Sequence, residues 1–570
     1  METLPALFLA RAQRSPDQVA MHAPVGLAGA AGGSAWAAIA WKDIEQAVAD
    51  VLAWLQTLGV EAGDRVAILG NPHPAWLNAD IAVLAAGAIT VGIYPTLLPD
   101  GVAYILHHAE ARLLLVESEA ELTRLGAVKN GDGWTVTGVQ ACVWHPPVRG
   151  GDSVGENQLA AERVDSLRVA VPKVSADQLC TLIYTSGTTG EPKGAMITHR
   201  AMVAVCYASR AALPLTGHHR SIVYLPLAHS LQRMAAYRSF LDDIEAWWCP
   251  QLADLPATLA VARPTVLVAV PRVLEKMQAR VEHAVQAQSA LVRWLYAWAV
   301  GVGGPLGPGS QAGLKHKLAE RLVLRKVRAR LGGIEVIGVG GAALNGGTAR
   351  FFQAIGVEVL EAWGLTETCA PATLNRPGRV RLGTVGTPLD GVTIRLLDDG
   401  EVLVRGPGLF SGYWRDDAAT ARAVIDGWFH TGDIGAIDAD GFLRIIDRKK
   451  ELIVTSGGKN IAPVPIERAL EGAGIGQAIV VGDGRPCLVA LLAEDPDNPP
   501  EDREQLGRDR VAAVNAALPP HERIKAWAWV APMTVEDGQL TPTLKPKRRV
   551  IAERYAAIVN GMYVGAAGTG

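Results

Sequence analysis

Residues 185–194 read TSGTTGEPKG, ten positions that hold three glycines, four hydroxyl side chains and one lysine. Apolar residues precede the stretch, GAMIT follows its lysine, and a helical pattern begins only near His199. The order therefore predicts a loop between two strands. Glycines let backbone amides approach an anion closely, while hydroxyls and a lysine add donors and positive charge. The stretch is a candidate phosphate-binding loop, with a mobile surface turn as the equal alternative.

This loop does not fit the nucleotide-binding loop of P-loop NTPases. That loop needs Gly-x4-Gly-Lys-Ser/Thr, with the lysine directly after glycine at the start of a helix. Here Lys193 follows Pro192, precedes Gly194 and is followed by residues typical of a strand. Spacing and context therefore exclude a P-loop, although the same phosphate chemistry stays available.

Helical and strand patterns alternate through the first part of the chain. WKDIEQAVADVLAWLQTLGV (41–60) and AWLNADIAVLAAGA (75–88) have helical spacing, whereas RVAILG (65–70) and ARLLLVES (111–118) are short apolar runs. Such alternation predicts βα units on a mostly parallel sheet. The Pro/Gly-rich residues 144–158 predict a surface loop that interrupts it.

Two later regions differ from this pattern. Residues 263–300 predict a buried strand ended by Pro271 and then a long helical region. Beyond Asp433, short strands and a helix with Pro465 near its start predict a compact α+β unit. We place the boundary near residues 447–450, which gives domains of 1–447 and 448–570.

Composition limits the classes of function. The chain has 570 residues, of which 49% are hydrophobic and 19% charged, as expected for a large folded protein. The net charge of −3 gives no overall attraction for nucleic acid, so no nucleic-acid partner is expected. Local basic stretches at 324–331 and 544–550 are either solvated faces or local phosphate contacts.

The compartment is predicted from cysteines and apolar segments. Six scattered cysteines show no metal-binding or disulfide spacing, which predicts a cytoplasmic protein. The N-terminal residues have no pattern of a secretory signal. The apolar stretch 79–95 contains Asp80 and is too short to span a bilayer. Peripheral membrane contact stays open.

Seven blocks in order carry a family resemblance. YTSGTTGEPKGAMITH (184–199) resembles the AMP-binding signature of the adenylate-forming superfamily, which includes acyl-CoA synthetases, luciferases and peptide-synthetase adenylation domains. The further blocks are YLPLAHSLQRM from Tyr224, GGAAL from Gly340, WGLTETC from Trp363, GWFHTGDIG from Gly427, DRKKELIVTSGGKNI from Asp447 and LTPTLKPKRR from Leu540. RPTVLVAVPRVLEKM from Arg263, SGGKNIAP and LTPTLK are most similar to the long-chain fatty acyl-CoA synthetase branch.

The resemblance implies an α/β fold with a large N-terminal domain of mostly parallel sheets and a small mobile α+β C-terminal domain. It implies an ATP-dependent long-chain fatty acid:CoA ligase that acts through an acyl-adenylate and releases AMP and pyrophosphate. ATP, Mg²⁺ and CoA would be required, and a monomer and a homodimer are both open. The alternatives are an aryl or medium-chain acyl-CoA ligase of the same fold and a nucleotide-binding pseudoenzyme.

The resemblance also implies roles around the nucleotide. The pyrophosphate end of ATP would contact Lys193 and the loop residues Thr185, Ser186, Gly187, Thr188, Thr189 and Gly190. Thr366 would contact phosphate, and Glu367 would ligate Mg²⁺. The adenine site would comprise Gly340, Gly341, Ala342, Trp363 and Gly364. Trp363 stands where the family usually has tyrosine, so a phenol hydroxyl is lost at that wall.

Further implied roles concern the ribose, the acyl group and the moving domain. Asp433 would accept hydrogen bonds from the ribose hydroxyls, supported by Arg448. Lys545 would bridge carboxylate and phosphate during adenylation, with Lys547 as a nearby alternative register. Lys450 would be the hinge, and Gly457 would enter the site only after rotation. His229, together with Arg233, would form a gate beside the acyl pocket, or His229 would be an ordinary core histidine.

A dinucleotide site is the competing interpretation of one block. Gly338, Gly340 and Ala343 follow an apolar strand, and Glu361 stands at the distance of the acidic residue that binds ribose in NAD enzymes. One such match is weak, and the same residues form the block that resembles the adenine site. We therefore favour the adenine site over NAD binding.

Overall fold

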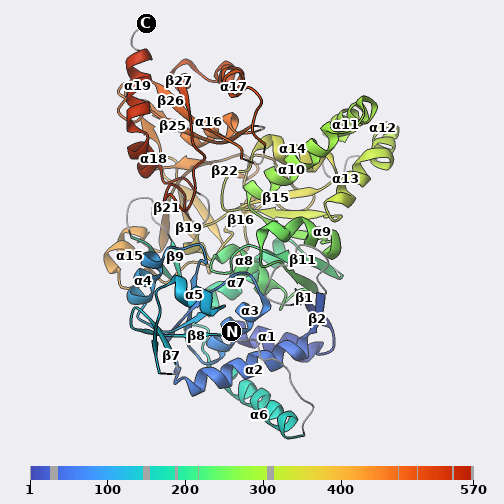
Figure 1. The fold of residues 1–570 in the computed structure, drawn as a ribbon, viewed down its shortest axis with the longest axis vertical. Helices are drawn as coiled ribbons and strands as arrows, with labels where there is room; N and C mark the ends of the chain where they lie inside the picture. The colour runs from blue at the N-terminus through green and yellow to red at the C-terminus, as the bar shows by residue number, and fades with distance from the viewer. Residues whose placement is uncertain are drawn as a thin grey trace.

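The structure, a computed structural model, describes residues 2–25, 36–131, 133–144, 154–185, 191–215, 217–303, 313–472, 474–496, 498–541 and 545–566. Figure 1 shows a large body that carries the N-terminus and, above it, a smaller lobe formed by the last part of the chain. The body contains four sheets, and the lobe contains one three-stranded sheet and a two-stranded ribbon.

The largest sheet has eight strands in the order β10-β9-β4-β3-β5-β8-β7-β6. Its central strands β9, β4, β3, β5 and β8 run parallel, as the alternating sequence pattern predicts. The strand bounds are β3 Arg65–Leu69, β4 Ile89–Ile93, β5 Ala111–Val116, β6 Val128–Asn130, β7 Gly133–Val136, β8 Val139–Val143, β9 Leu179–Thr185 and β10 Lys193–Thr198.

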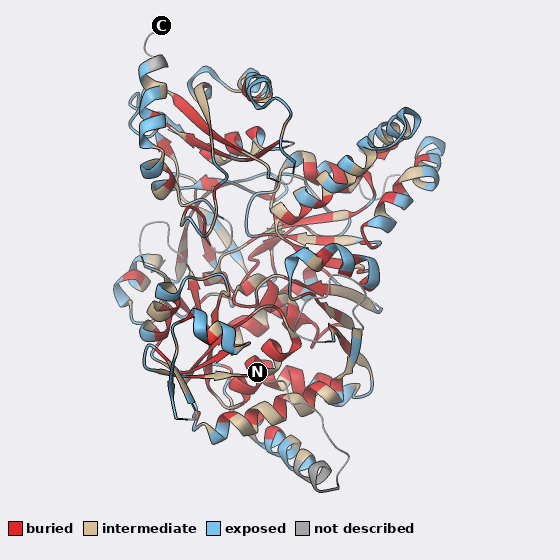
Figure 2. Cartoon of the chain, viewed as in Figure 1, coloured by how far each residue is buried: buried red, intermediate tan, exposed pale blue. Residues whose placement is uncertain are grey.

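Helices cover both faces of this sheet. On strand β3, Val66 and Ile68 join a core with helices α1 (Leu4–Arg14), α2 (Trp41–Thr57) and α3 (Pro74–Ala85). Ala67 and Leu69 point to the opposite face and join a second core with α4 (Pro99–His108) and α5 (Glu119–Arg124). Successive strand residues alternate between faces, so a strand buried on both sides reads as a continuous apolar run. Figure 2 shows the resulting buried interior.

The predicted loop at residues 144–158 is partly wrong. Helix α6 (Val154–Ala170) begins inside it, while residues 145–153 lie outside the described part of the chain. The Pro and Gly residues that suggested a loop precede the helix, and the chain from Glu156 onward lacks such breakers. The loop prediction therefore extended a few residues too far.

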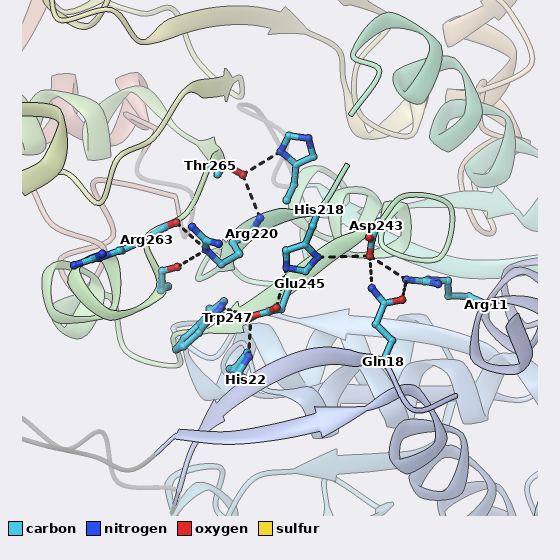
Figure 3. A network of polar contacts seen from close by, with 12 residues as sticks. Arg11, Gln18, His22, His218, Arg220, Asp243, Glu245, Trp247, Arg263 and Thr265 are labelled. Carbon is cyan, nitrogen blue, oxygen red and sulfur yellow. Dashed lines mark hydrogen bonds and ion pairs between the residues drawn. The ribbon is translucent and has the colours of Figure 1, made fainter. Parts of the chain in front are cut away.

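A four-stranded sheet, β11-β12-β1-β2, lies at one side of the body. Its strands are β1 Val19–Pro24, β2 Trp36–Ala40, β11 His219–Val223 and β12 Ile244–Trp248. Figure 3 shows the polar network on its surface, in which Glu245 pairs with His22 at 2.7 Å and with His218 at 3.0 Å. The neighbouring Asp243 accepts a hydrogen bond from Gln18. These contacts tie segments far apart in sequence into one sheet.

The third sheet, β13-β14-β15-β16-β17, has three parallel strands followed by two antiparallel ones. Its strands are β13 Val266–Ala269, β14 Val336–Val339, β15 Glu358–Trp363, β16 Thr373–Leu374 and β17 Thr387–Pro388. The predicted strand before Pro271 is confirmed, and the long helical region after it forms two helices, α10 (Pro271–Gln286) and α11 (Ala290–Gly303).

The fourth sheet is antiparallel, with the order β18-β19-β21-β20 and β22 paired to β21. Its strands are β18 Thr393–Leu396, β19 Glu401–Arg405, β20 Val424–Ile425, β21 Trp428–Ile437 and β22 Leu443–Arg448. The register of β21 and β22 places Asp433 opposite Arg448. Two residues from separate sequence blocks thus meet on one ladder.

The last part of the chain has its own core. Strands β25 (Ile475–Val481), β26 (Leu488–Glu494) and β27 (Ile524–Val530) form the sheet, and helices α16 (Pro463–Leu470), α17 (Arg503–Ala517), α18 (Arg548–Arg554) and α19 (Ala556–Ala566) surround it. Its two apolar clusters contain only residues from Ile453 onward. This matches the predicted α+β unit. No helix among the described residues is long and apolar enough to cross a bilayer.

Candidate active site

The candidate phosphate loop joins two antiparallel strands. Thr185, the last residue of β9, lies opposite Lys193, the first residue of β10, which confirms the predicted strand–loop–strand context. Ser186, Gly187, Thr188, Thr189 and Gly190 lie outside the described residues. The Nζ atom of Lys193 lies 3.0 Å from Asp416 Oδ2 and 5.3 Å from the ring centre of Tyr413. Its charge is thus held at the edge of the loop.

Thr366 and Glu367 are presented by a tight turn after β15. The turn is the short helix η4 (Thr366–Thr368), and a side chain at Gly364 would place its Cβ 2.0 Å from the carbonyl oxygen of Ala370. Cys369 and Ala370 adopt φ values of +57° and +96°, a conformation that non-glycine residues rarely adopt. Only glycine therefore fits at position 364, and the strained turn fixes Glu367.

Tyr413 connects the loop lysine to this turn, and no sequence motif indicated this role. Its hydroxyl donates a hydrogen bond to Glu367 Oε1 at 2.7 Å, and Lys193 lies over its ring. The backbone of Met196 on β10 bonds to both Ser411 and Gly412, which brings the segment of Tyr413 alongside the loop. Tyr413 and Asp416 lie between the sequence blocks of the resemblance, so no motif identified them.

Glu367 fits a magnesium ion that arrives with a nucleotide. The residue is 8% exposed, and Tyr413 bonds to Oε1, while no protein donor within the described chain bonds to Oε2. The described residues contain no group of three or more metal-ligating side chains. One carboxylate suits Mg²⁺, which keeps waters and binds substrate phosphates, better than a metal held by protein alone.

The carboxylate of Asp433 is fixed at both oxygens. The indole Nε1 of Trp363 donates to Oδ2 at 2.8 Å, and Arg448 Nε lies 2.9 Å from Oδ1. Burial raises the pKa of Asp433, and Arg448 and the Trp363 hydrogen bond oppose that rise. Trp363 thus supplies a donor of its own in place of the phenol hydroxyl expected at this position.

We expect Trp363→Phe to weaken ATP binding about tenfold. The change keeps an aromatic ring but leaves a buried Asp433 oxygen without its donor, which costs on the order of 1–3 kcal/mol. The KM for ATP should rise more than kcat falls. Trp134→Phe on β7 is the control for indole loss elsewhere. An unchanged ATP KM would show that the Trp363 hydrogen bond does not position Asp433.

The two parts of the candidate adenine site lie side by side. A Cβ at Gly340 would approach the carbonyl oxygen of Ala362 to 3.4 Å, so the end of β14 and the end of β15 are close. Gly341 has a φ of +86°, and Gly341 and Ala342 are exposed at the surface. These residues and Trp363 therefore border one region, as the parallel register of β14 and β15 requires.

Lys545 comes from the lobe, yet its charge interacts with the body. Part of the Lys545 surface is exposed to solvent, while desolvation, followed by the Arg448 charge, lowers the pKa of its ammonium group; Asp433, Glu451 and Glu367 oppose that shift. Its backbone closes a turn with Thr541 through N–H···O bonds of 2.8 and 3.0 Å. Lys545 thus lies within electrostatic reach of both candidate site carboxylates.

The two residues implied in domain movement lie on exposed turns. Lys450 lies two residues after the end of β22, and Gly457 lies between the short strands β23 (Ile453–Val454) and β24 (Asn460–Ile461). A side chain at Gly457 would meet only Thr455 Oγ1, at 3.9 Å. The proposed hinge and CoA-step roles stay predictions.

His229 and Arg233 have different surroundings. His229 precedes α8 (Ser230–Arg238), and its Nδ1 accepts the backbone N–H of Leu231 at 3.1 Å. Desolvation and the nearby Lys545 charge lower the pKa of His229 to about 4. Arg233 is fully buried and pairs with Asp80, so it points into the core. Sequence resemblance placed both residues at a gate, but only His229 interacts with Lys545.

Substitutions at His229 separate helix capping from a gate. His229→Ala should lower the free energy of unfolding by about 1 kcal/mol because the cap acceptor is lost, whereas His229→Asn should retain the cap. Both free energies come from denaturant unfolding. If His229 also acts as a gate, ligase activity falls in His229→Asn with stability intact. Equal activity in His229→Asn and the wild type would leave capping as its role.

Glu361 is a buried carboxyl that the adenine-site interpretation left without a role. It lies on β15, is 8% exposed and accepts a hydrogen bond from Gly383 N at 2.9 Å. Burial raises its pKa to about 7, and that hydrogen bond only partly offsets the rise. Near neutral pH the Glu361 side chain is therefore partly protonated.

We expect Glu361→Gln to stabilise the protein by an amount that grows between about pH 4.5 and pH 7 and stays constant at higher pH. A carboxyl whose pKa rises on folding favours the folded state below its unfolded pKa and loses that contribution as pH rises through about 7. The gain at pH 9 is up to about 3 kcal/mol. Thermal unfolding of the wild type and Glu361→Gln from pH 5 to 9 measures it, with the exposed Glu335→Gln as control. A difference independent of pH would contradict the shift.

The fold is that of an α/β protein, and its candidate site gathers carboxylates and cations from the body and the lobe. Residues 8–414 match the family model described as AMP-binding enzyme, and residues 450–567 match the AMP-binding enzyme C-terminal domain. The chain therefore belongs to the AMP-binding enzyme family. This assignment favours the adenine-site interpretation of residues 338–343 over NAD binding.

Individual relatives agree with this assignment. Long-chain-fatty-acid–CoA ligase FadD15 of Mycobacterium bovis is 38% identical over 550 residues, which cover 89% of each chain. The anthranilate CoA ligase AuaEII in complex with anthranoyl-AMP superposes with a TM-score of 0.73 at 19% identity, covering 97% of each chain. The O-succinylbenzoate CoA synthetase MenE of Bacillus subtilis, in complex with ATP and magnesium, superposes with a TM-score of 0.69 at 21% identity. The superposition covers 95% of this chain and 98% of that chain.

Proposed function

We propose that this protein is an AMP-forming long-chain fatty acid:CoA ligase that acts through an acyl-adenylate. The observation that carries the proposal is the position of Lys545, a cation from the lobe that interacts with Asp433 and Glu367 of the body. Negative charge develops on phosphate oxygens when a carboxylate attacks ATP, so a cation close to the candidate ribose-binding and Mg²⁺-binding carboxylates is positioned to stabilise it. The 38% identity to a long-chain-fatty-acid–CoA ligase supports the substrate class.

In the first half-reaction, an oxygen of the fatty carboxylate attacks the α-phosphorus of ATP, and the bond to pyrophosphate breaks. Negative charge develops on phosphate oxygens, so fixed cations and donors stabilise the transition state. Lys545 would contact the carboxylate and α-phosphate, and residues 185–190 with Lys193 and Thr366 would hold the departing phosphates. A Mg²⁺ held by Glu367 would supply further charge neutralisation. Asp433 would hold the ribose through its fixed oxygens.

In the second half-reaction, the thiol of CoA attacks the acyl carbonyl carbon, and AMP leaves with the electrons of the anhydride bond. For this step we propose that the domain 448–570 rotates about Lys450 relative to the domain 1–447, so that Lys545 leaves and Gly457 enters. His229, neutral near pH 7 because its pKa lies near 4, would border the acyl group without adding charge.

AMP release in the presence of ATP, Mg²⁺ and CoA tests the function across acetate, octanoate, benzoate, palmitate and oleate. We expect CoA-dependent turnover that is highest with palmitate or oleate. Highest turnover with benzoate or octanoate would favour the aryl or medium-chain alternative, and no turnover or pyrophosphate exchange with any acid would favour the pseudoenzyme.

A further inference from the structure

A helical pair projects from the body with apolar side chains on its outer surface. Helix α11 is followed by a helical segment that runs without a break through α12 (Leu314–Ala319), η3 (Glu320–Leu324) and α13 (Arg325–Arg330). Figure 1 shows both extending from the upper right of the body, and Figure 2 shows their exposed surface. The residues 304–312 between them lie outside the described chain.

The inner and outer faces of this pair differ sharply. Ala299, Ala319, Leu324 and Val327 are buried in the core formed with the third sheet. The outer apolar side chains have large exposed fractions: Leu291 65%, Val292 41%, Trp294 63%, Leu314 86%, Leu318 51% and Leu322 42%. Leu314, Leu318 and Leu322 are four residues apart and therefore form one stripe. The pair is thus anchored on one side and leaves an apolar surface on the other.

Positive charge accompanies this apolar surface. Between Ala290 and Arg330 the sequence has eight Lys and Arg residues and one acidic residue, Glu320, although the whole chain has a net charge of −3. Glu320 pairs with Arg328. Lys317, Arg321 and Arg325 are exposed and also four residues apart, so a cationic stripe runs beside the leucines. We call the outer residues 291–294 and 314–326 the hairpin face.

We propose that the hairpin face docks on a membrane surface that contains anionic lipid. Leucine and tryptophan side chains beside lysine and arginine match a bilayer interface, where apolar groups enter the acyl boundary and cations meet headgroups. A nucleic acid would leave the leucines exposed, and a neutral protein surface would leave the cations unpaired. The inference does not depend on the proposed ligase activity.

Vesicle co-sedimentation of the full chain tests the proposal. The vesicles are phosphatidylcholine alone and phosphatidylcholine with phosphatidylglycerol at a 7:3 ratio. The apolar variant is Trp294→Ser/Leu314→Ser/Leu318→Ser, and the charge variant is Lys315→Gln/Lys317→Gln/Arg321→Gln. The matched controls remove exposed residues elsewhere: Leu98→Ser/Leu252→Ser/Val261→Ser and Arg503→Gln/Arg508→Gln/Arg549→Gln.

We expect wild type and both controls to bind the anionic vesicles and to bind phosphatidylcholine much more weakly. Each hairpin-face variant should lose at least about tenfold in affinity, and high salt should weaken wild-type binding. Circular dichroism and thermal unfolding establish that the variants are folded. Unchanged binding of either variant, or no binding by wild type, would overturn the proposal. A wild-type dimer that the apolar variant makes monomeric, without vesicle binding, would instead assign the face to a second copy.

Discussion

Lys545→Ala should abolish acyl-adenylate formation while sparing thioester formation from supplied acyl-AMP. The expected loss in the first half-reaction is about 100- to 1,000-fold, the range for removing one fixed charge or donor from developing negative charge. The physical reason is the position of Lys545, whose cation interacts with Asp433, Glu367 and His229 together. No other step in the proposal uses this ammonium group.

The two half-reactions can be measured separately. Pyrophosphate exchange reports adenylation, and palmitoyl-AMP with CoA reports thioester formation. Lys547→Ala is the matched control, because it removes a neighbouring lysine from the same segment. Gly457→Leu should show the opposite pattern, since its turn is exposed here and has room for a side chain. Equal loss of both half-reactions in Lys545→Ala would contradict a two-orientation mechanism.

A few polar contacts hold the lobe against the body in this structure. Arg468 of the lobe approaches Glu275 of α10 to 3.7 Å, Arg272 approaches Asp495 to 3.7 Å, and Asn345 donates to the Arg468 carbonyl at 3.0 Å. These contacts are long or partly exposed, so each contributes little. The lobe is therefore held by weak polar contacts that rotation can exchange.

Arg233→Met should lower the free energy of unfolding by about 3–5 kcal/mol, the largest stability effect that we expect. Arg233 and Asp80 are both fully buried, and Tyr237 and Thr181 complete their hydrogen bonds. Removing the guanidinium leaves the Asp80 carboxylate buried without a counterion. The double variant Asp80→Asn/Arg233→Met should recover much of the loss, because no charge then remains buried.

Denaturant unfolding of the single and double variants measures this coupling. The exposed Arg210→Met is the control for loss of an arginine from a neighbouring helix. If Arg233 instead acted at an acyl gate, Arg233→Met would lose activity with little change in stability. That outcome would restore the role that the sequence resemblance implied and contradict the structural one.

Local features of the sequence were enough to predict much of the fold. The order of the blocks, the strands around residues 185–194 and the βα alternation all follow from periodicity and from glycine and proline positions. Neighbouring residues determine these features, so they need no tertiary information. The errors were local too: α6 begins earlier than the composition of residues 144–158 suggested.

Only the tertiary packing determined which residues far apart in the sequence contact each other. Trp363 and Asp433 are 70 residues apart, Tyr413 and Glu367 are 46 apart, and Arg233 and Asp80 are 153 apart. The family resemblance identified Trp363 and Asp433 but not the hydrogen bond between them, and it did not identify Tyr413. It also implied that Arg233 lies at a gate beside His229, whereas Arg233 is buried in the core with Asp80. The sequence by itself determined the elements and the family blocks. The packing of the sheets determined which side chains contact each other. The energy of such a contact depends on the distance between two residues in the folded structure, and a local sequence pattern does not specify that distance.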